Sequence, residues 1–134
     1  MNLELYNLIL NSILTGIIIT TQIVTYPLLK YVNRDFTLFH QKYVSRIGFI
    51  VAPIMVLELT VVGKMVIDDF YNPLIKLLAF FTILIWLSTF FIQVPIHKQL
   101  SKGKNLTRLK ILIASNWIRT IGWSLKLALS ATLI

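Results

Sequence analysis

The sequence contains no cysteine and few acidic residues. Of its 134 residues, five are Asp or Glu and thirteen are Lys or Arg. Without cysteine there can be no disulfide, no thiolate metal ligand and no cysteine nucleophile. The HExxH, GxSxG, P-loop and GxGxxG patterns are also absent, so zinc-protease, serine-hydrolase and nucleotide-binding functions lack support.

Charge is absent above all from long apolar stretches. Residues 5–29 and 77–96 carry none, and 47–63 carry only Glu58. A helix of about 20 apolar residues crosses the hydrocarbon core of a bilayer. With 57% hydrophobic residues and a mean hydropathy of +0.79, the sequence predicts an all-α integral membrane protein. We expect one domain (1–134) of four transmembrane helices, at about 5–30, 36–67, 73–100 and 105–133.

The connectors between these helices are short, which predicts an up-down-up-down bundle. The first residues, Met1-Asn2-Leu3-Glu4, lack the basic region and cleavage site of a signal peptide, so we expect the first apolar block to be retained as a span. No internal repeat is strong enough to carry an argument. A bundle with so small a core makes a homo-oligomer reasonable, although no clear GxxxG stripe points to one.

The net charge of +8 comes from basic residues that flank apolar blocks, a pattern typical of membrane proteins and not of nucleic-acid binding. Residues 30–46 carry four basic residues and one acid, and residues 98–110 carry five and none. The positive-inside rule then places these two connectors in the cytoplasm and both termini outside, in a membrane of the bacterial inner-membrane type.

Polar side chains from all four predicted helices fall in the half of the bundle nearer those connectors. Depth along each helix follows from the rise of about 1.5 Å per residue. It places Glu58 and Arg119 near the midplane and Lys126 nearer the outer face, where it could snorkel. The ligand-binding candidates at this end are Gln22, Tyr26, Gln93, Asn116 and Trp123, with His40 and His97 near the interface.

Glu58 and Arg119 have two interpretations. An unpaired charge inside a membrane is costly, so the simpler interpretation is a structural ion pair between the second and fourth helices. In the functional interpretation, Arg119 binds an anionic or carbonyl group of a ligand, because its guanidinium suits carboxylates and phosphates. Similarly, the amides of Gln22, Gln93 and Asn116 either join helices or line a polar cavity.

The two histidines, His40 and His97, lie at the same end of neighbouring helices. Because an imidazole titrates near working pH, His97 or His40 suits proton transfer. Alternatively they are ligands of haem b or of a metal ion. A third interpretation is that both merely meet water and lipid headgroups at the interface.

Two short motifs carry a family resemblance: Thr89-x5-Pro95-x-His97-x2-Leu100, and Asn116-x2-Arg119. Together with Pro27 after the first span, they resemble the anthrone-oxygenase-like family of small four-helix membrane proteins. The family more often has Asn where His97 stands. The resemblance implies a four-helix membrane fold and a cofactor-independent oxygenase acting on polycyclic aromatic phenols.

The sequence therefore leaves three functional hypotheses. We favour a polar intramembrane pocket near the cytoplasmic face that binds a lipophilic molecule bearing an oxygen function. If the protein is an oxidoreductase, it oxidises this molecule in the pocket. His97, His40 and Arg119 are then the catalytic candidates, and no cofactor is required. The second hypothesis is a bis-histidine haem or metal protein. The third is a non-enzymatic membrane subunit or lipid-binding protein, whose polar residues only specify helix packing.

Overall fold

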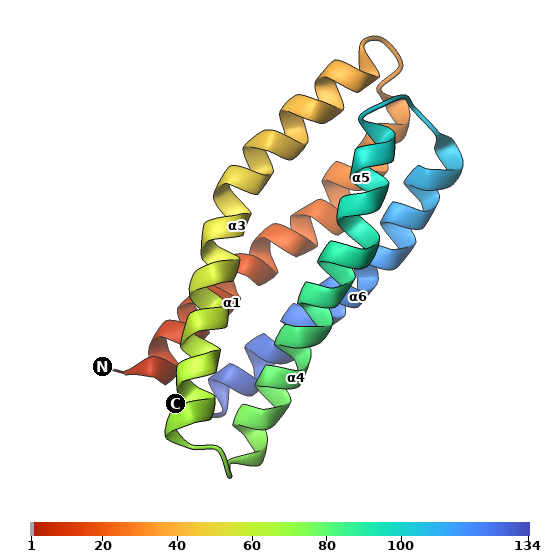
Figure 1. Cartoon of the computed structure of the whole chain (residues 1–134). Helices are drawn as coiled ribbons and strands as arrows, with labels where there is room; N and C mark the ends of the chain where they lie inside the picture. The colour runs from red at the N-terminus through yellow and green to blue at the C-terminus, as the bar shows by residue number, and fades with distance from the viewer. Residues whose placement is uncertain (1) are drawn as a thin grey trace.

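The computed structural model describes residues 2–134, which form four long helical stretches and no strand. The stretches run up and down in turn as a bundle, with both ends of the chain at the same end of it (Figure 1). This confirms the prediction of an all-α chain with four helices. In chain order the stretches are α1 (Leu3–Thr20), η1 (Thr21–Thr25), α2 (Tyr26–Leu28) and η2 (Leu29–Tyr31); α3 (Phe36–Asp68); α4 (Pro73–Ser88), η3 (Thr89–Gln93) and α5 (Val94–Leu100); and α6 (Leu106–Ala131).

Three of the four stretches begin at an asparagine cap. The side chains of Asn2, Asn72 and Asn105 accept hydrogen bonds from backbone N–H groups of the first turns of α1, α4 and α6. Such a cap satisfies a donor that has no partner within the helix. After Asn72, Pro73 takes the first helical position, where its missing N–H costs nothing.

The first and third stretches share a local pattern, although no internal repeat was predicted from the sequence. Each contains one π-helical turn, η1 or η3, followed by a proline two positions after the turn ends, at Pro27 or Pro95. In both, a threonine six residues before the proline (Thr21 or Thr89) opens the turn. Because proline lacks an N–H and its ring clashes with the preceding helical turn, a local widening lets the helix continue past it.

The helices pack in three apolar layers from one end of the bundle to the other. The layer at the end of the first and third connectors includes Leu29, Phe36, Leu100 and Leu109, all buried. A middle layer surrounds Trp123, and a third layer surrounds Leu78. α1 and α4 each pack along both α3 and α6, which leaves α3 and α6 diagonally opposite. Where α6 packs against α4, a side chain at Gly122 would meet Ile85.

Three of the stretches, Leu3–Tyr31, Phe36–Asp68 and Pro73–Leu100, are long and apolar enough to cross a membrane. Large apolar side chains cover their outer surface, with Phe49 83% and Phe91 75% exposed. α6 is less apolar than these three because it carries Asn116, Arg119, Lys126 and other polar residues. The side chains of Asn116, Arg119 and Lys126 are buried in the bundle, whereas Ile111, Ile121 and Leu125 of α6 face outward. The chain therefore has the character of a membrane protein.

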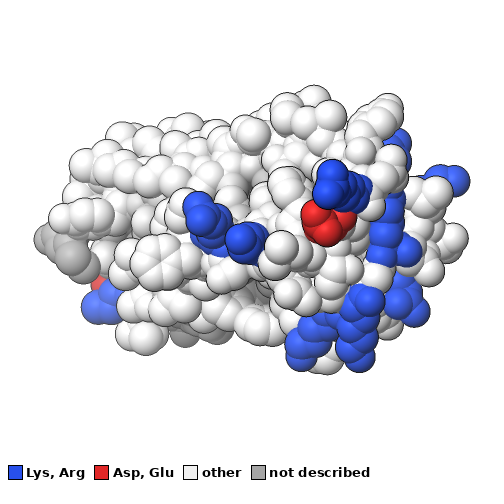
Figure 2. Space-filling model, turned by 90° about the horizontal axis from the view of Figure 1, so that it is seen from above, with Lys and Arg blue, Asp and Glu red and all other residues white. Residues whose placement is uncertain are grey.

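Basic side chains gather at the end of the bundle that carries the first and third connectors. Figure 2 shows Lys and Arg concentrated toward one end of the visible face, with few acidic residues among them. Lys104 binds this end together, because its ammonium donates to the backbone carbonyls of Lys30 and Val32 and to the side chain of Asn33. The charge asymmetry read from the sequence is thus a property of one end of the folded bundle.

Candidate functional site

A cavity of about 410 Å³ lies between α1, α3, α6 and the stretch formed by α4, η3 and α5. Its walls are mostly apolar, and they include Leu14, Ile18, Val51, Met55 and Trp86. It reaches the outer surface between α3 and η3, where the lining residues Val56 and Phe90 are 52% and 55% exposed. A volume of this size lies within the range of about 300–1,000 Å³ that is usual for small-molecule sites.

Polar side chains line the cavity toward the basic end of the bundle. Tyr26 comes from α2, Tyr43 from α3, Gln93 and His97 from η3 and α5, and Arg119 from α6. Tyr26 and His97 lie on α2 and α5, the short helical segments that follow the two π-helical turns. The cavity is therefore amphipathic, with an apolar body and one polar end.

Arg119 is the charged residue of this polar end. Its side chain is only 8% exposed, and its buried Nε has no hydrogen-bond partner. Within residues 2–134 no carboxylate pairs with it, and its guanidinium carbon lies 5.3 Å from the centre of the Trp123 ring. A buried guanidinium beside an open cavity and without a counterion is a candidate site for an anionic or polar oxygen of a ligand.

Tyr26, His97, His40 and Ser101 form one hydrogen-bonded chain. The Tyr26 hydroxyl lies 2.9 Å from His97 Nε2, and His97 Nδ1 lies 3.0 Å from His40 Nε2. His40 Nδ1 lies 3.0 Å from the Ser101 hydroxyl. The structure thus brings together both histidines and Tyr26, which sequence depth placed at the same end of the bundle.

This contact does not fit a bis-histidine haem. Two axial histidines present free nitrogens to an iron from opposite sides, whereas all four ring nitrogens of His40 and His97 are engaged with protein groups. Among the described residues, no group of three or more His, Cys, Asp or Glu is placed to hold a metal ion. His40 and His97, the metal ligands of the predicted alternative, bond to protein groups in this structure.

The three amides are held by different partners. Gln22 accepts from Asn116 Nδ2 at 2.9 Å and donates to the carbonyl of Ile113, so these amides join α6 to η1 and do not line the cavity. Gln93 does line the cavity, while its amide donates to the Ser115 hydroxyl at 2.9 Å. Its oxygen is buried and has no partner, which leaves one acceptor for a group in the cavity.

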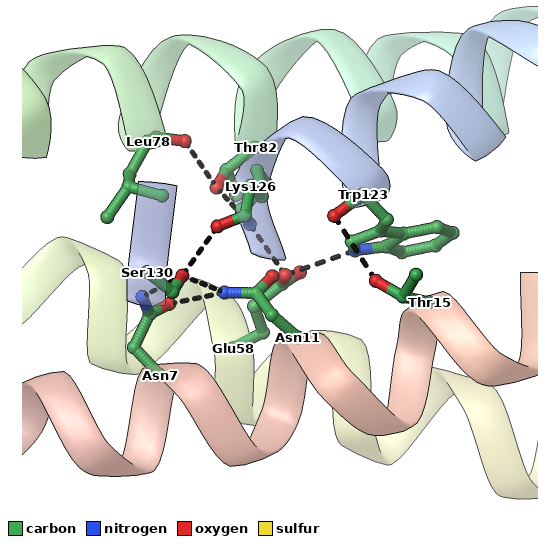
Figure 3. A network of polar contacts seen from close by, with 9 residues as sticks. All are labelled: Asn7, Asn11, Thr15, Glu58, Leu78, Thr82, Trp123, Lys126 and Ser130. Atoms are coloured by element: carbon green, nitrogen blue, oxygen red, sulfur yellow. Dashed lines mark hydrogen bonds and ion pairs between the residues drawn. The ribbon is translucent and has the colours of Figure 1, made fainter. Parts of the chain in front are cut away.

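The predicted ion pair between Glu58 and Arg119 is wrong. Glu58 instead pairs with Lys126, whose ammonium lies 2.6 Å from Glu58 Oε1, and both side chains are fully buried (Figure 3). Glu58 lies 22 residues into α3 and Lys126 lies 20 residues into α6, whereas Arg119 lies only 13 residues into α6. Lys126 therefore reaches the depth of Glu58 and does not snorkel outward.

Around this ion pair lies a buried polar network that joins all four helical stretches (Figure 3). Trp123 Nε1 donates to Glu58 Oε1 at 3.0 Å, and the Lys126 ammonium donates to the Thr82 hydroxyl at 2.6 Å. Trp123 thus both lines the cavity and closes it off from the ion pair.

One turn further along α6, the Ser130 hydroxyl accepts from the amides of Asn7 and Asn11 at 2.8 and 2.9 Å. Sequence analysis did not single out this cluster. The four-residue spacing of Asn7 and Asn11 on an otherwise apolar helix was the available clue.

Comparison of the chain with protein-family models, with curated proteins and with solved structures finds no match. The cavity and the residues around it are therefore the features that point to a function.

Proposed function

We propose that this protein binds, within the bilayer, a lipophilic small molecule that bears a carboxylate or phenolate oxygen. The observation that carries the proposal is Arg119, a buried cation without a counterion at the polar end of an otherwise apolar cavity. A charged side chain inside a membrane costs about 2.5–3.5 kcal/mol on insertion scales. A ligand anion on the guanidinium would offset that cost and place the apolar part of the ligand against Leu14, Met55 and Trp86.

The Tyr26 hydroxyl can donate a second hydrogen bond to the same oxygen, whereas the Gln93 carbonyl only accepts and cannot bond an anionic oxygen. The Tyr26 hydroxyl and the buried Gln93 carbonyl lie at this end of the cavity with His97. The amphipathic lining favours a ligand with one polar end over a uniformly apolar lipid chain. A purely structural role for these polar residues leaves the Arg119 guanidinium without a carboxylate partner among residues 2–134.

Anthracene-9-carboxylate and the uncharged 9-anthracenemethanol, which is similar in shape, test the proposal with the protein in lipid nanodiscs. Binding is measured by energy transfer from tryptophan. Replacement of the guanidinium in Arg119→Gln should weaken binding of the carboxylate about tenfold or more, which is about 1.4 kcal/mol, and change binding of the alcohol little. Equal affinity of both proteins for the carboxylate would refute the role of Arg119.

Gly48 offers a second, matched test. It lines the cavity, and a side chain added there meets nothing within 4 Å. Gly48→Leu should therefore fill the cavity without disturbing the fold and weaken binding of both anthracenes. Gly63→Leu, on the same helix, is the control because Gly63 is exposed, has equal space and lies outside the cavity.

We further propose that all four helices cross the membrane, with connectors 30–46 and 98–110 in the cytoplasm. The nine basic residues against one acid in these connectors support this orientation. Since the chain has no cysteine, single variants can be labelled in intact cells with a membrane-impermeant maleimide. Asn72→Cys should be labelled and Asn33→Cys should be protected. The reverse labelling pattern would show that connectors 30–46 and 98–110 lie outside the cell.

The resemblance to anthrone-oxygenase-like proteins suggests, in addition, that the bound molecule is a polycyclic phenol that dioxygen oxidises. Arg119 would then hold the phenolate while His97 and His40 accept or return its proton. Anthrone with dioxygen, followed by mass spectrometry of the product, tests this extension. Turnover no faster than in the Gly48→Leu variant would reject it.

A further inference from the structure

The hydrogen-bonded chain of Tyr26, His97, His40 and Ser101 runs from the cavity to the basic end of the bundle. Tyr26 and His97 line the cavity. Ser101 ends α5 at the third connector and is partly exposed. His40, between them, is fully buried and stacks on Phe36, with ring centres 5.6 Å apart. The chain is therefore open at both ends and enclosed in the middle.

The distances restrict how protons can be distributed along this chain. A neutral imidazole has one donor nitrogen and one acceptor nitrogen. The contact of 3.0 Å between His97 Nδ1 and His40 Nε2 needs one proton between the two atoms. Once that proton is assigned to one ring, the outer nitrogens are assigned as well, so every donor in the chain points the same way.

Two such arrangements satisfy every contact. In the first, Ser101 donates to His40, His40 to His97, and His97 to the Tyr26 oxygen, which leaves the Tyr26 proton free to point into the cavity. In the second, Tyr26 donates to His97, His97 to His40, and His40 to the Ser101 oxygen. Neither arrangement contains a charged ring. The two differ only by the shift of one proton along each link of the chain.

We propose that this chain is a proton path that connects the ligand cavity with the aqueous phase at the basic end of the bundle. The group that exchanges its proton with Tyr26 is an oxygen of the bound ligand, and only this part of the proposal rests on the proposed function. It assigns His40, which lies outside the cavity lining, a role in moving protons.

The transfer balances at each atom. The Tyr26 O–H bond breaks as its proton passes to the ligand oxygen, and His97 Nε2 gives its proton to the Tyr26 oxygen. His40 Nε2 then protonates His97 Nδ1, and the Ser101 hydroxyl protonates His40 Nδ1. Water at the third connector restores the Ser101 proton. The first arrangement becomes the second, and one proton has entered the cavity without a charged intermediate at rest.

The surroundings favour such neutral transfer. The charged group that faces the chain from inside the bundle is Arg119 of α6, at the cavity end, and Tyr43 of α3 is the other titratable neighbour there. At the outer end the Lys104 ammonium lies 5.8 Å from the centre of the Phe36 ring. The positive charge of Arg119 at the cavity end and the burial of His40 disfavour a proton resting on either imidazole, so protons would pass along the chain in a concerted shift.

Nitrogen NMR of protein with ¹⁵N-labelled histidine tests the path without any ligand. Since the chain has two histidines, four ring-nitrogen signals report the whole path. We expect a scalar coupling across the link between His40 and His97. We also expect shifts intermediate between protonated and unprotonated nitrogen, from exchange between the two arrangements. In Ser101→Ala the exchange should stop. Two rings that are each fixed in one tautomer in the wild-type protein would overturn the proposal.

A kinetic test uses 4-butyl-7-hydroxycoumarin, a lipophilic phenol whose fluorescence reports its ionisation. After a rapid change of external pH, Ser101→Ala and His40→Phe should slow protonation of the cavity-bound probe at least about tenfold, with affinity for the probe unchanged. Ser45→Ala, exposed on the same helix as His40, should keep the wild-type rate. The Gly48→Leu protein, whose cavity is filled, serves as the control for the fluorescence of probe that is dissolved in lipid and not bound.

The two proposals fail in different ways. If the wild-type protein does not bind the coumarin more than Gly48→Leu does, the proposed binding function is weakened, and the NMR result alone decides the proton path. If the probe binds and Ser101→Ala and His40→Phe protonate it at the wild-type rate, the path is overturned while the binding site stands.

Discussion

Removing the cation of the buried ion pair should be among the most destabilising single changes in this protein. In Lys126→Met the carboxylate of Glu58, which is fully buried, keeps its hydrogen bond from Trp123 but loses its counterion. Thr82 loses the ammonium as well. Breaking a buried pair in this way costs about 3–5 kcal/mol.

The same structure offers a matched comparison. Lys64 and Asp68 form an ion pair on the surface of α3, with the two side chains 52% and 45% exposed. An exposed pair at this helical spacing contributes about 0.3–0.5 kcal/mol. Lys64→Met should therefore change the free energy of unfolding roughly tenfold less than Lys126→Met, although each substitution removes the lysine of one ion pair.

The double variant Glu58→Gln with Lys126→Met separates loss of charge from loss of packing. Removing both charges should recover most of the stability that Lys126→Met loses, because no isolated charge remains buried. The free energy of unfolding is measured by titration with sodium dodecyl sulfate in mixed micelles, followed by tryptophan fluorescence. The reasoning fails if Lys126→Met costs no more than Lys64→Met, or if the double variant is no more stable than Lys126→Met.

Three further predictions concern the contacts between helices, and the same titration measures each. Gly122→Ala places a methyl carbon 2.9 Å from Ile85 Cγ1 and should cost about 1–3 kcal/mol; Ile85→Ala, added to it, should restore part of the loss. Ser130→Ala leaves the amides of Asn7 and Asn11 without their shared acceptor and should cost about 1–3 kcal/mol. Gln22→Leu removes the acceptor of Asn116 and Thr120 and should cost a similar amount, whereas an unchanged unfolding curve would place these amides in contact with water.

The helical architecture could be predicted from the sequence because long charge-free blocks and Asn-containing connectors define each helix locally. For residues near a connector, depth along the helix correctly predicted which side chains lie at the same end of the bundle. It brought Tyr26, His40 and His97 to one end, where the structure joins them. It failed at Glu58, far from either connector, where Arg119 and Lys126 lie two turns apart on the same side of α6.

The π-helical turns could not be predicted from the sequence. The Thr21–Pro27 and Thr89–Pro95 spacings are visible in the sequence, but a proline alone does not indicate whether a helix kinks, stops or widens. Gln93 lines the cavity and Gln22 does not. Gln22 is the second residue of its π-helical turn and Gln93 is the fifth residue of its own, so the two amides leave their helices in different directions.

The open side of the cavity, between Val56 of α3 and Phe90 of η3, lies on the apolar outer surface of the bundle. In a bilayer that side opens onto lipid tails, so a ligand dissolves in the membrane before it meets the protein. Occupancy then follows the mole fraction of ligand in the lipid and not its concentration in water. Doubling the lipid at fixed total ligand should lower occupancy, and two ligands with equal contacts but different solubility in lipid should differ in apparent affinity.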